Sequence, residues 1–301
     1  MMANDPTLFR EKVHESLRRQ VSAINFLAAN ASLRFWDYGN AFLLQSSRAG
    51  ADIFDKKNPT KFRYPSYVED IMGDVFSLGF GPFRWVCCSG KDADLKITDE
   101  LAAEIFTKFS EDCTLSEETR EQYKDNLDWI IKAPNNCLVV GSKARILYSD
   151  LIGRQKLAQA FNVAIKEGKI SAPVVLSRDH HDVSGTDSPY RETSNINDGS
   201  KFCADMAIQN VIGDSFRGAT WVSIHNGGGV GWGEVINGGF GLVLDGSDEA
   251  NERATLMLQW DVANGVARRA WSGHGLAQEA IGASMKSFPD LELTPCYLKD
   301  D

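Results

Sequence analysis

Residues 219–233 read ATWVSIHNGGGVGWG, a short β-type run that leads into five glycines within the seven positions 227–233. His225 stands at the junction between the two parts. Glycine lacks a Cβ, so a glycine-rich backbone can approach an anionic or planar ligand closely, and fixing such a backbone carries an extra entropic cost. We therefore expect this loop to contact a ligand, with a tight connection between two strands as the alternative.

The glycine run does not have the spacing of a dinucleotide-binding fingerprint. None of its registers gives G-x-G-x-x-G. A β-type pattern also resumes at 240–244, which is too soon for the stable helix that follows the glycine turn in a Rossmann unit. The loop is predicted to be a ligand contact but not the fingerprint itself.

Strand and helix patterns alternate from residue 144 onward. Such alternation is typical of an α/β fold with a mostly parallel sheet flanked by helices. We expect strands at 145–149, 173–177, 220–224 and 240–244, and helices at 154–166, 202–212 and 248–260.

Polar residues follow each of these strands. In a parallel sheet, ligands bind at the carboxyl ends of the strands. The sequence therefore predicts that four polar strand exits converge on one edge of the sheet to form a site. These exits are Ser149-Asp150, residues 178–182 (RDHHD), His225-Asn226-Gly227 and Asp245-Gly246.

The first part of the chain follows a different pattern. Asp5-Pro6 is a helix start, and apolar residues at helical spacing as far as Leu27 predict a long amphipathic helix. Residues 35–84 are rich in Gly, Pro and aromatic residues, which predicts an ordered but irregular region that is buried or faces a ligand. Residues 97–133 return to charged helical segments.

Composition excludes several classes of protein. The chain has 301 residues, of which 43% are hydrophobic, enough for a substantial core and for two domains. A net charge of −9 without a basic cluster argues against nucleic acid or an acidic membrane as a partner. No apolar segment has the length of a membrane span, and six cysteines without a C-x-x-C pair indicate reduced thiols in a cytosolic setting.

Residues 179–182 (DHHD) could be taken for metal ligands. Consecutive residues on an extended segment point to opposite faces, so all four side chains cannot converge on one ion, and no metal is expected. General acid–base chemistry by one carboxylate and one imidazole is the favoured interpretation.

Arg84 and Tyr38 are two further candidates. Arg84 follows a Gly-Pro turn and lies between aromatic residues, which suits bidentate capture of a carboxylate. A surface arginine that stacks on Trp85 is the alternative. Tyr38, before Gly39, could be a plain core residue beside a turn.

Seven long stretches together closely resemble the urocanase (urocanate hydratase) family. The resemblance extends over essentially the whole chain and is to the C-terminal half of that family. The stretches are FWDYGNAFLL (35–44), FRYPSYVEDIMG (62–73), GFGPFRWVCCSG (79–90), SAPVVLSRDHHDVSGTDSPYRET (171–193), DGSKFCAD (198–205), GATWVSIHNGGGVGWG (218–233) and VLDGSDEANERA (243–254).

The resemblance implies a cytoplasmic, homodimeric hydro-lyase of histidine degradation. Members of the family add water to urocanate and form 4-imidazolone-5-propionate. They hold NAD⁺ tightly, and its nicotinamide acts as an electrophile toward the substrate imidazole without net hydride transfer. The protein then supplies orientation and electrostatics around a reactive cofactor.

The resemblance also implies roles for particular residues. Tyr38 in the D-Y-G-N motif, with Gly228 and Gly229 in H-N-G-G-G-V-G, would contact NAD. Arg84 matches the arginine that holds the urocanate carboxylate.

The family's proton-transfer group corresponds to the R-D-H-x-D motif here. Asp179, His180 and Asp182 are therefore the candidate catalytic residues, and the choice between the two carboxylates stays open.

Two departures from the family pattern affect the expectation. Bacterial members have a cysteine in an A-R-I-C-W segment, whereas residues 144–148 here read ARILY, which resembles the eukaryotic branch and puts any mechanism that needs this thiol in doubt. The family's N-terminal half is also absent. Residues 1–70 are expected to be the C-terminal tail of the NAD-binding domain, and residues 71–301 the C-terminal part of the core domain.

The missing half would contain the main phosphate-binding loop. We therefore expect the 301-residue chain to bind NAD weakly or not at all, and to be inactive alone. Two other classes remain as alternatives: an NAD-dependent oxidoreductase domain, and a non-catalytic binding module.

Overall fold

A computed structural model describes residues 4–37, 41–139, 141–178, 205–226, 236–271, 274–288 and 290–293. The chain divides into two compact units, Met1–Gly73 and Asp74–Asp301. Within the described part of the chain, no helix is both long enough and apolar enough to cross a membrane.

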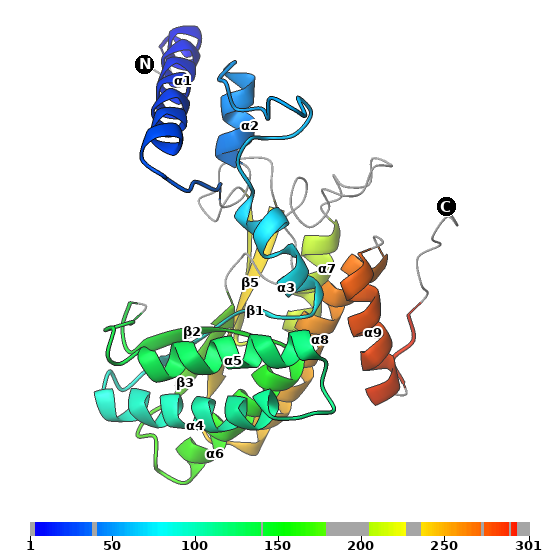
Figure 1. The fold of residues 1–301 in the computed structure, drawn as a ribbon. Coiled ribbons are helices and arrows are strands. Elements are labelled where there is room, and N and C mark those ends of the chain that lie inside the picture. The colour runs from blue at the N-terminus through cyan, green and yellow to red at the C-terminus, as the bar shows by residue number, and fades with distance from the viewer. Residues whose placement is uncertain are drawn as a thin grey trace. The chain divides into compact units, whose positions relative to one another are not determined.

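The first unit begins with the predicted helix, α1 (Pro6–Asn30) (Figure 1). Its N-cap is Asp5, whose side chain accepts a hydrogen bond from the Leu8 backbone N–H at 2.9 Å, so the predicted helix start is confirmed. The unit also contains α2 (Ala41–Arg48) and one turn of π-helix, η1 (Tyr67–Ile71).

The aromatic region after α1 is ordered where the structure describes it, as predicted. The Phe35 ring makes edge-on contacts with Phe42 and Tyr64, at centroid distances of 5.7 and 5.2 Å. Asp37, which is buried, accepts a hydrogen bond from the Leu43 backbone N–H at 2.9 Å. These contacts hold residues 35–37 against α2.

The second unit contains a five-stranded sheet with the order β2-β1-β3-β5-β4. Every pair of neighbouring strands is antiparallel, so the prediction of a mostly parallel sheet is wrong. The strands are β1 (Gly81–Cys87), β2 (Ala144–Ser149), β3 (Val174–Arg178), β4 (Trp221–Asn226) and β5 (Ile236–Leu244).

The error has a physical cause. β2, β3 and β4 do run in one direction, as the alternation of strands and helices indicates, but β1 lies between β2 and β3, and β5 lies between β3 and β4. The first four residues of β1 fall inside the stretch 35–84, which we expect to be irregular, because Gly81-Pro82 resembles a turn.

β4 and β5 pair directly across the glycine run. Asn226 is opposite Ile236, so the run 227–233 connects two antiparallel neighbours, as the alternative interpretation proposed. Residues 227–235 themselves lie outside the described residues, and their contact with a ligand stays a prediction.

One face of the sheet, which we call the core face, is covered by helices. Phe83, Trp85, Leu176 and Leu242 point to this face and have no exposed surface. They pack against side chains of α4, α6 and α8. The described helices of this unit are α3 (Gly73–Ser77), α4 (Asp92–Ser110), α5 (Glu117–Lys132), α6 (Leu151–Lys166), α7 (Asp205–Phe216), α8 (Asp248–Trp271) and α9 (Gly275–Ser287).

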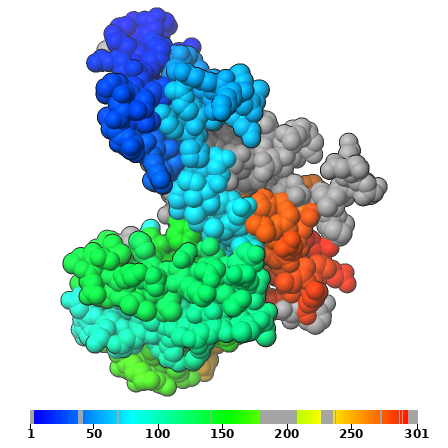
Figure 2. All heavy atoms as spheres, viewed as in Figure 1, coloured from blue at the N-terminus to red at the C-terminus, as the bar shows by residue number. Residues whose placement is uncertain are grey.

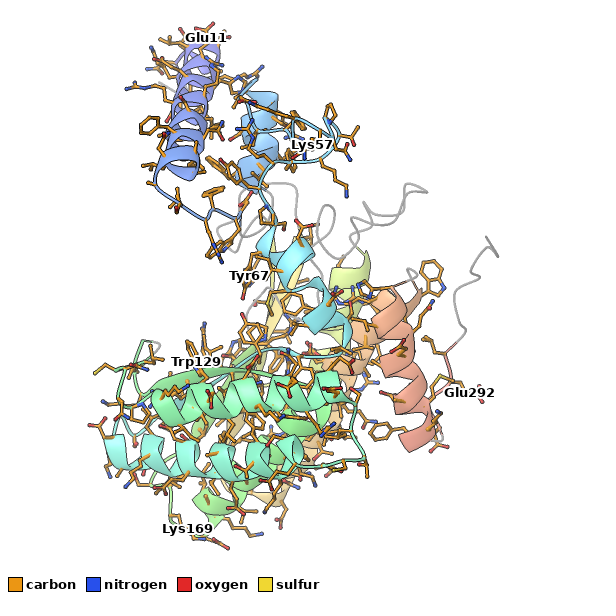
Figure 3. All side chains as sticks on the ribbon, in the orientation of Figure 1. Glu11, Lys57, Tyr67, Trp129, Lys169 and Glu292 are labelled. Carbon is orange, nitrogen blue, oxygen red and sulfur yellow. The ribbon has the colours of Figure 1, made fainter. Side chains whose placement is uncertain are left out.

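α4 and α5 lie side by side and form one continuous surface (Figures 1 and 2). α5 also seals the edge strand β2. The Asn126 side chain donates to the Tyr148 carbonyl at 2.6 Å and accepts from the Tyr148 N–H at 2.8 Å, so it satisfies backbone groups that an edge strand would leave open. Trp129 lies on the outer side of α5 with 51% of its surface exposed (Figure 3).

Candidate functional site

Three of the four predicted strand exits meet at one end of the sheet. Because β2, β3 and β4 run in the same direction, their last residues, Ser149, Arg178 and Asn226, face the same end, which we call the exit end. β5 runs the opposite way, so Asp245-Gly246 leaves at the other end. The expected convergence of all four exits is therefore wrong for Asp245-Gly246.

Most of the predicted site residues lie outside the described residues. These are the catalytic candidates Asp179, His180 and Asp182 and the cofactor candidates Tyr38, Gly228 and Gly229. Their roles stay predictions. In the sequence, Asp179 directly follows the last residue of β3, and Gly228 and Gly229 come shortly after the last residue of β4. Both strands finish at the exit end.

Arg84 is described, and it lies on the face of the sheet opposite the core face. Its strand neighbours, Phe83 and Trp85, are fully buried on the core face, whereas Arg84 is half-buried. Successive side chains of a strand point to opposite faces, so Arg84 cannot stack on Trp85. The structure therefore excludes the alternative explanation of Arg84.

A row of directly opposed residues crosses all five strands at Arg84. Directly opposed residues share a face of the sheet, so we call this face the Arg84 face. The row runs Ile146, Arg84, Ser177, Gly241, Trp221.

The Trp221 indole covers Gly241 within this row. A Cβ built on Gly241 would lie 1.8 Å from the Trp221 Cζ2 atom, so only glycine leaves space for the ring. Trp221 keeps 47% of its surface exposed. On the same face, the hydroxyl of Ser223 lies 3.0 Å from Nε2 of His225. The face thus presents a cation, an aromatic ring and small polar side chains.

Beneath the exit end, on the core side of the sheet, Asp261 of α8 binds two buried arginines. Arg178 Nε donates to Asp261 Oδ1 at 3.1 Å, and Arg154 Nη1 lies 3.4 Å from Oδ2, with no exposed surface on any of the three side chains. Arg178 also donates to the Gly238 carbonyl, and Arg154 Nε to the Ser149 carbonyl at 2.9 Å. One carboxylate therefore links β2, β3, β5, α6 and α8.

α7 joins this network through Asn210, which is fully buried. Its amide donates to Asp261 Oδ1 at 3.1 Å and to Asp214 Oδ2 at 3.2 Å, and it accepts from Asn264 at 2.8 Å. Sequence reasoning missed these residues. One signal could have found Arg154: it is a charged residue at the same three-residue spacing as the apolar residues Leu151 and Leu157, which marks the buried face of the helix.

Asp150 follows β2 at the exit end and caps α6. Its carboxylate accepts from the Gly153 N–H at 2.8 Å and from the Tyr123 hydroxyl at 2.5 Å. The residue keeps some exposed surface, but protein atoms surround its carboxyl group. Burial raises the pKa of Asp150, and the hydrogen bonds from Tyr123 and Gly153 oppose this shift.

We expect Asp150→Asn to remove a pH-dependent contribution to stability. The raised pKa of Asp150 means that the folded state holds the proton more tightly than the unfolded state, so stability from this group is present below about pH 4 and is lost as pH rises through the folded pKa. Asparagine keeps a capping oxygen and does not titrate. Urea unfolding at pH 4, 5.5 and 7 should show the wild type losing stability relative to Asp150→Asn as pH rises; a constant difference would contradict the assignment.

Leu147 occupies the position of the cysteine in the bacterial A-R-I-C-W segment. It has 1% of its surface exposed, on the core face, directly opposite Phe83. Its side chain therefore points away from the Arg84 face. The doubt about a thiol-dependent mechanism stays in place.

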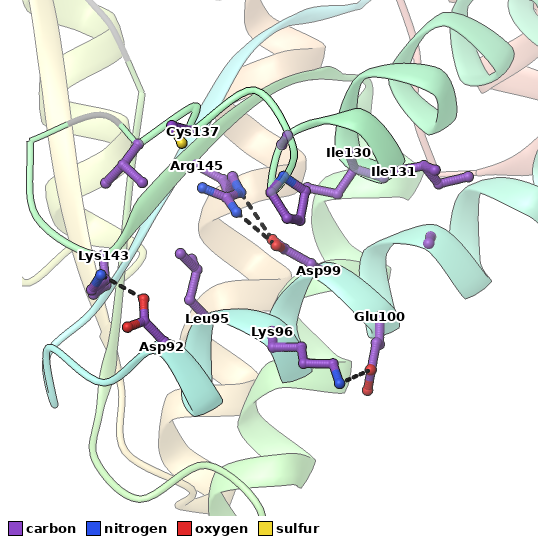
Figure 4. Close-up of a pocket in the computed structure, with 14 residues that line it drawn as sticks. Asp92, Leu95, Lys96, Asp99, Glu100, Ile130, Ile131, Cys137, Lys143 and Arg145 are labelled. Atoms are coloured by element: carbon purple, nitrogen blue, oxygen red, sulfur yellow. Dashed lines mark hydrogen bonds and ion pairs between the residues drawn. The ribbon is translucent and has the colours of Figure 1, made fainter.

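A cavity of about 600 Å³ lies between α4 and the segment that connects α5 to β2 (Figure 4). In the wall of this cavity, Arg145 and Asp99 form a bidentate ion pair, with N–O distances of 2.8 and 3.1 Å. Burial raises the pKa of Asp99, against the hydrogen bonds from Arg145. Arg145 is near the start of β2, so this cavity is away from the exit end.

Two family models cover most of the chain. The Urocanase C-terminal domain matches residues 74–283, and the Urocanase Rossmann-like domain matches residues 1–71. The chain belongs to the urocanase family. The resemblance seen in the sequence motifs is thereby confirmed.

Proteins named as urocanate hydratases are similar to the urocanase chain over its whole length. The urocanate hydratase of Homo sapiens is 62% identical over an alignment of 303 positions, which covers 100% of this chain and 44% of that protein. A probable urocanate hydratase of Caenorhabditis elegans is 60% identical over 98% of this chain and 44% of that protein. A probable urocanate hydratase of Dictyostelium discoideum is 59% identical over 100% and 45%, respectively. The chain thus spans less than half the length of these relatives.

The Rossmann-like match is consistent with a nucleotide cofactor in the urocanase family. In the described part of the first unit, however, β-structure consists only of isolated bridges, Asp37 to Ser66 and Phe54 to Phe62. A pyrophosphate cradle needs a strand that turns into a helix. The described residues of this unit do not make such a cradle by themselves. Among all described residues, no cluster of three or more His, Cys, Asp or Glu side chains could hold a metal ion.

Proposed function

We propose that the full-length protein to which this chain belongs is a urocanate hydratase, a hydro-lyase that adds water to urocanate and forms 4-imidazolone-5-propionate. The observation that carries the proposal is the identity of 62% with the human urocanate hydratase over the whole of this chain. Arg84 on a face that is not packed into the core supports it, because a half-buried guanidinium suits an anionic substrate.

We assign substrate binding to Arg84. Its planar guanidinium can hold a carboxylate with two parallel hydrogen bonds, and this fixes the orientation of a flat substrate. Its neighbour across the sheet, Ser177, is small, which leaves room for the acrylate tail. The rigid strand β1 holds the cation in place.

We assign proton transfer to the segment that contains Asp179, His180 and Asp182. Hydration of the conjugated system requires protons to be moved, and carboxylate and imidazole groups do this near neutral pH. Arg178, which precedes this segment, is anchored by the buried carboxylate of Asp261, and this supports a fixed start for the segment. Asp179 and Asp182 both remain candidates.

We propose NAD⁺ as the cofactor of the full-length protein, in the role of an electrophile and with Tyr38, Gly228 and Gly229 as contacts. The Rossmann-like match over residues 1–71 supports a nucleotide cofactor. The described residues of the first unit do not supply a pyrophosphate cradle by themselves, and we place that cradle in the part of the full-length protein that lies outside this chain.

We further propose that residues 1–70 are the tail of the NAD-binding domain and residues 71–301 the later part of the core domain. The boundary between the compact units at Gly73 supports this division, as does the gap between the two family matches. We also propose a cytoplasmic homodimer, as the family resemblance implies.

The decay of the ultraviolet absorbance of urocanate tests the function. The full-length protein should consume urocanate, and the 301-residue chain alone should not, because our proposal places the pyrophosphate cradle outside this chain. Oxidation of a hydride donor without urocanate consumption would instead indicate an NAD-dependent oxidoreductase. Tight stoichiometric binding of NAD⁺ to the isolated chain in a calorimetric titration would contradict the expectation that this chain binds NAD weakly or not at all.

We expect Arg84→Ala in the full-length protein to weaken urocanate binding by at least ~2 kcal/mol, which is roughly a 30-fold rise in Kd, since a charge-assisted pair is lost. Arg84→Lys should restore part of the affinity. Lys132→Ala, on the surface of α5, is the matched control, because it removes an exposed cation far along the chain from β1. Unchanged substrate affinity in Arg84→Ala would remove Arg84 from this role.

A further inference from the structure

Trp221 and Arg84 lie in the same cross-strand row and on the same face of the sheet. Three strand spacings separate them, through Ser177 and Gly241, so their Cα atoms are about 14 Å apart. The two residues between them carry the smallest side chains in the row. The row therefore has two small residues at its middle, with a cation on one side of them and an indole on the other, and we call this part of the row the trough.

The indole leans into the trough. A Cβ on Gly241 would lie within 1.8–2.3 Å of three atoms of the Trp221 ring, so the ring lies across β5 and toward β3. In the next row on this face, Pro82 and Tyr148 stand on β1 and β2, whereas β5 and β4 carry the small residues Gly239 and Ser223. The Gly239 Cβ position is 3.2 Å from the Ser223 hydroxyl. On β5 and β4, the floor of the trough thus continues toward the exit end.

We propose that Trp221 is a second substrate-binding residue, whose indole stacks on the ring of the molecule whose carboxylate Arg84 holds. The inference rests on the proposed function. The indole lies above β5, and β5 is two strand spacings, roughly 10 Å, from β1. The Arg84 side chain can extend from β1 into part of this distance. This span suits a flat five-membered ring with a short conjugated acid tail, and stacking favours such a ring.

The competing explanation is structural. An aromatic side chain that covers a glycine on a neighbouring strand stabilises the pair by shielding the exposed backbone. That explanation predicts that Trp221 contributes to unfolding stability alone. Stacking predicts in addition that Trp221 distinguishes ligands with a ring from ligands without one.

The test uses full-length protein and two probes that cannot be hydrated to product: imidazolepropionate, which lacks the double bond, and acrylate, which lacks the ring. Trp221→Leu should weaken imidazolepropionate binding about tenfold and raise the KM for urocanate, with acrylate binding unchanged. Arg84→Ala should weaken both probes. Trp221→Phe should keep most of the affinity, and Trp129→Leu, which removes an equally exposed tryptophan from α5, should have no effect.

The possible results distinguish failure of the stacking role of Trp221 from failure of the proposed hydratase function. If wild-type protein does not consume urocanate, the proposed function fails. If it does and Trp221→Leu binds imidazolepropionate like the wild type, or weakens both probes equally, the stacking role fails. Should Trp221→Leu not fold, Trp221→Phe and Gly241→Ala carry the test: the new Cβ displaces the indole, so Gly241→Ala must weaken imidazolepropionate but not acrylate.

Discussion

Asp261→Ala is expected to lower the free energy of unfolding by about 3–5 kcal/mol, because it leaves two buried arginines without their shared carboxylate. Arg154, Arg178 and Asp261 have no exposed side-chain surface, so water cannot replace the lost charge. The buried amide of Asn210 also loses one of its two carboxylate acceptors, since only Asp214 remains. Urea denaturation followed by circular dichroism measures the change.

Two further variants make this prediction specific. Asp261→Asn keeps the shape and one acceptor oxygen, so it should be destabilised less than Asp261→Ala. Glu104→Ala removes an exposed carboxylate that pairs with Lys108 on α4, and the denaturation midpoint should not change measurably. An unchanged midpoint in Asp261→Ala would show that the carboxylate does not hold the arginines.

Trp85→Ala should destabilise the protein by a similar amount, about 3–5 kcal/mol. The Trp85 ring has no exposed surface, packs 5.2 Å from the Phe161 ring and donates from Nε1 to the Thr98 hydroxyl at 2.9 Å. Truncation would leave a large cavity between β1, α4 and α6, since close-packed interiors relax only in part.

Trp129→Ala provides the comparison for Trp85. It removes the same side chain from a half-exposed position on α5, and the effect should stay within about 0.5 kcal/mol. Thermal and urea unfolding of both variants measure the difference. Equal losses of stability at the two positions would contradict the placement of Trp85 at the centre of the core.

Local patterns in the sequence predicted the elements but not their pairing. The strand expected at 145–149 is Ala144–Ser149, and the helix expected at 248–260 is confirmed and continues to Trp271. These elements depend on neighbouring residues. Strand order depends on contacts between distant segments, so the insertion of β1 and β5 between co-directional strands could not be predicted from periodicity. The Gly-Pro pair at 81–82 is typical of a turn and places the first half of β1 in the expected irregular region, although a proline near the first position of a strand is tolerated.

The same limit applies to the candidate site. Arg84 stood out because a Gly-Pro turn and aromatic residues surround it in the sequence. Asp261 did not, because its partners Arg154 and Arg178 are 107 and 83 residues away along the chain. Trp221 was part of a recognised motif, but its relation to Arg84 requires the register of four strands.

The reversed strands between β2, β3 and β4 also affect how the loops can change. Loops that leave β2, β3 and β4 start about 10 Å apart, twice the spacing in a uniformly parallel sheet. The segments that lead into β1 and β5 reach the sheet between these exits, so other parts of the chain separate the three exits from one another. An insertion in one of these loops should be tolerated independently of the others. The ligand specificity of a site built from these loops can therefore change one loop at a time, while the sheet stays the same.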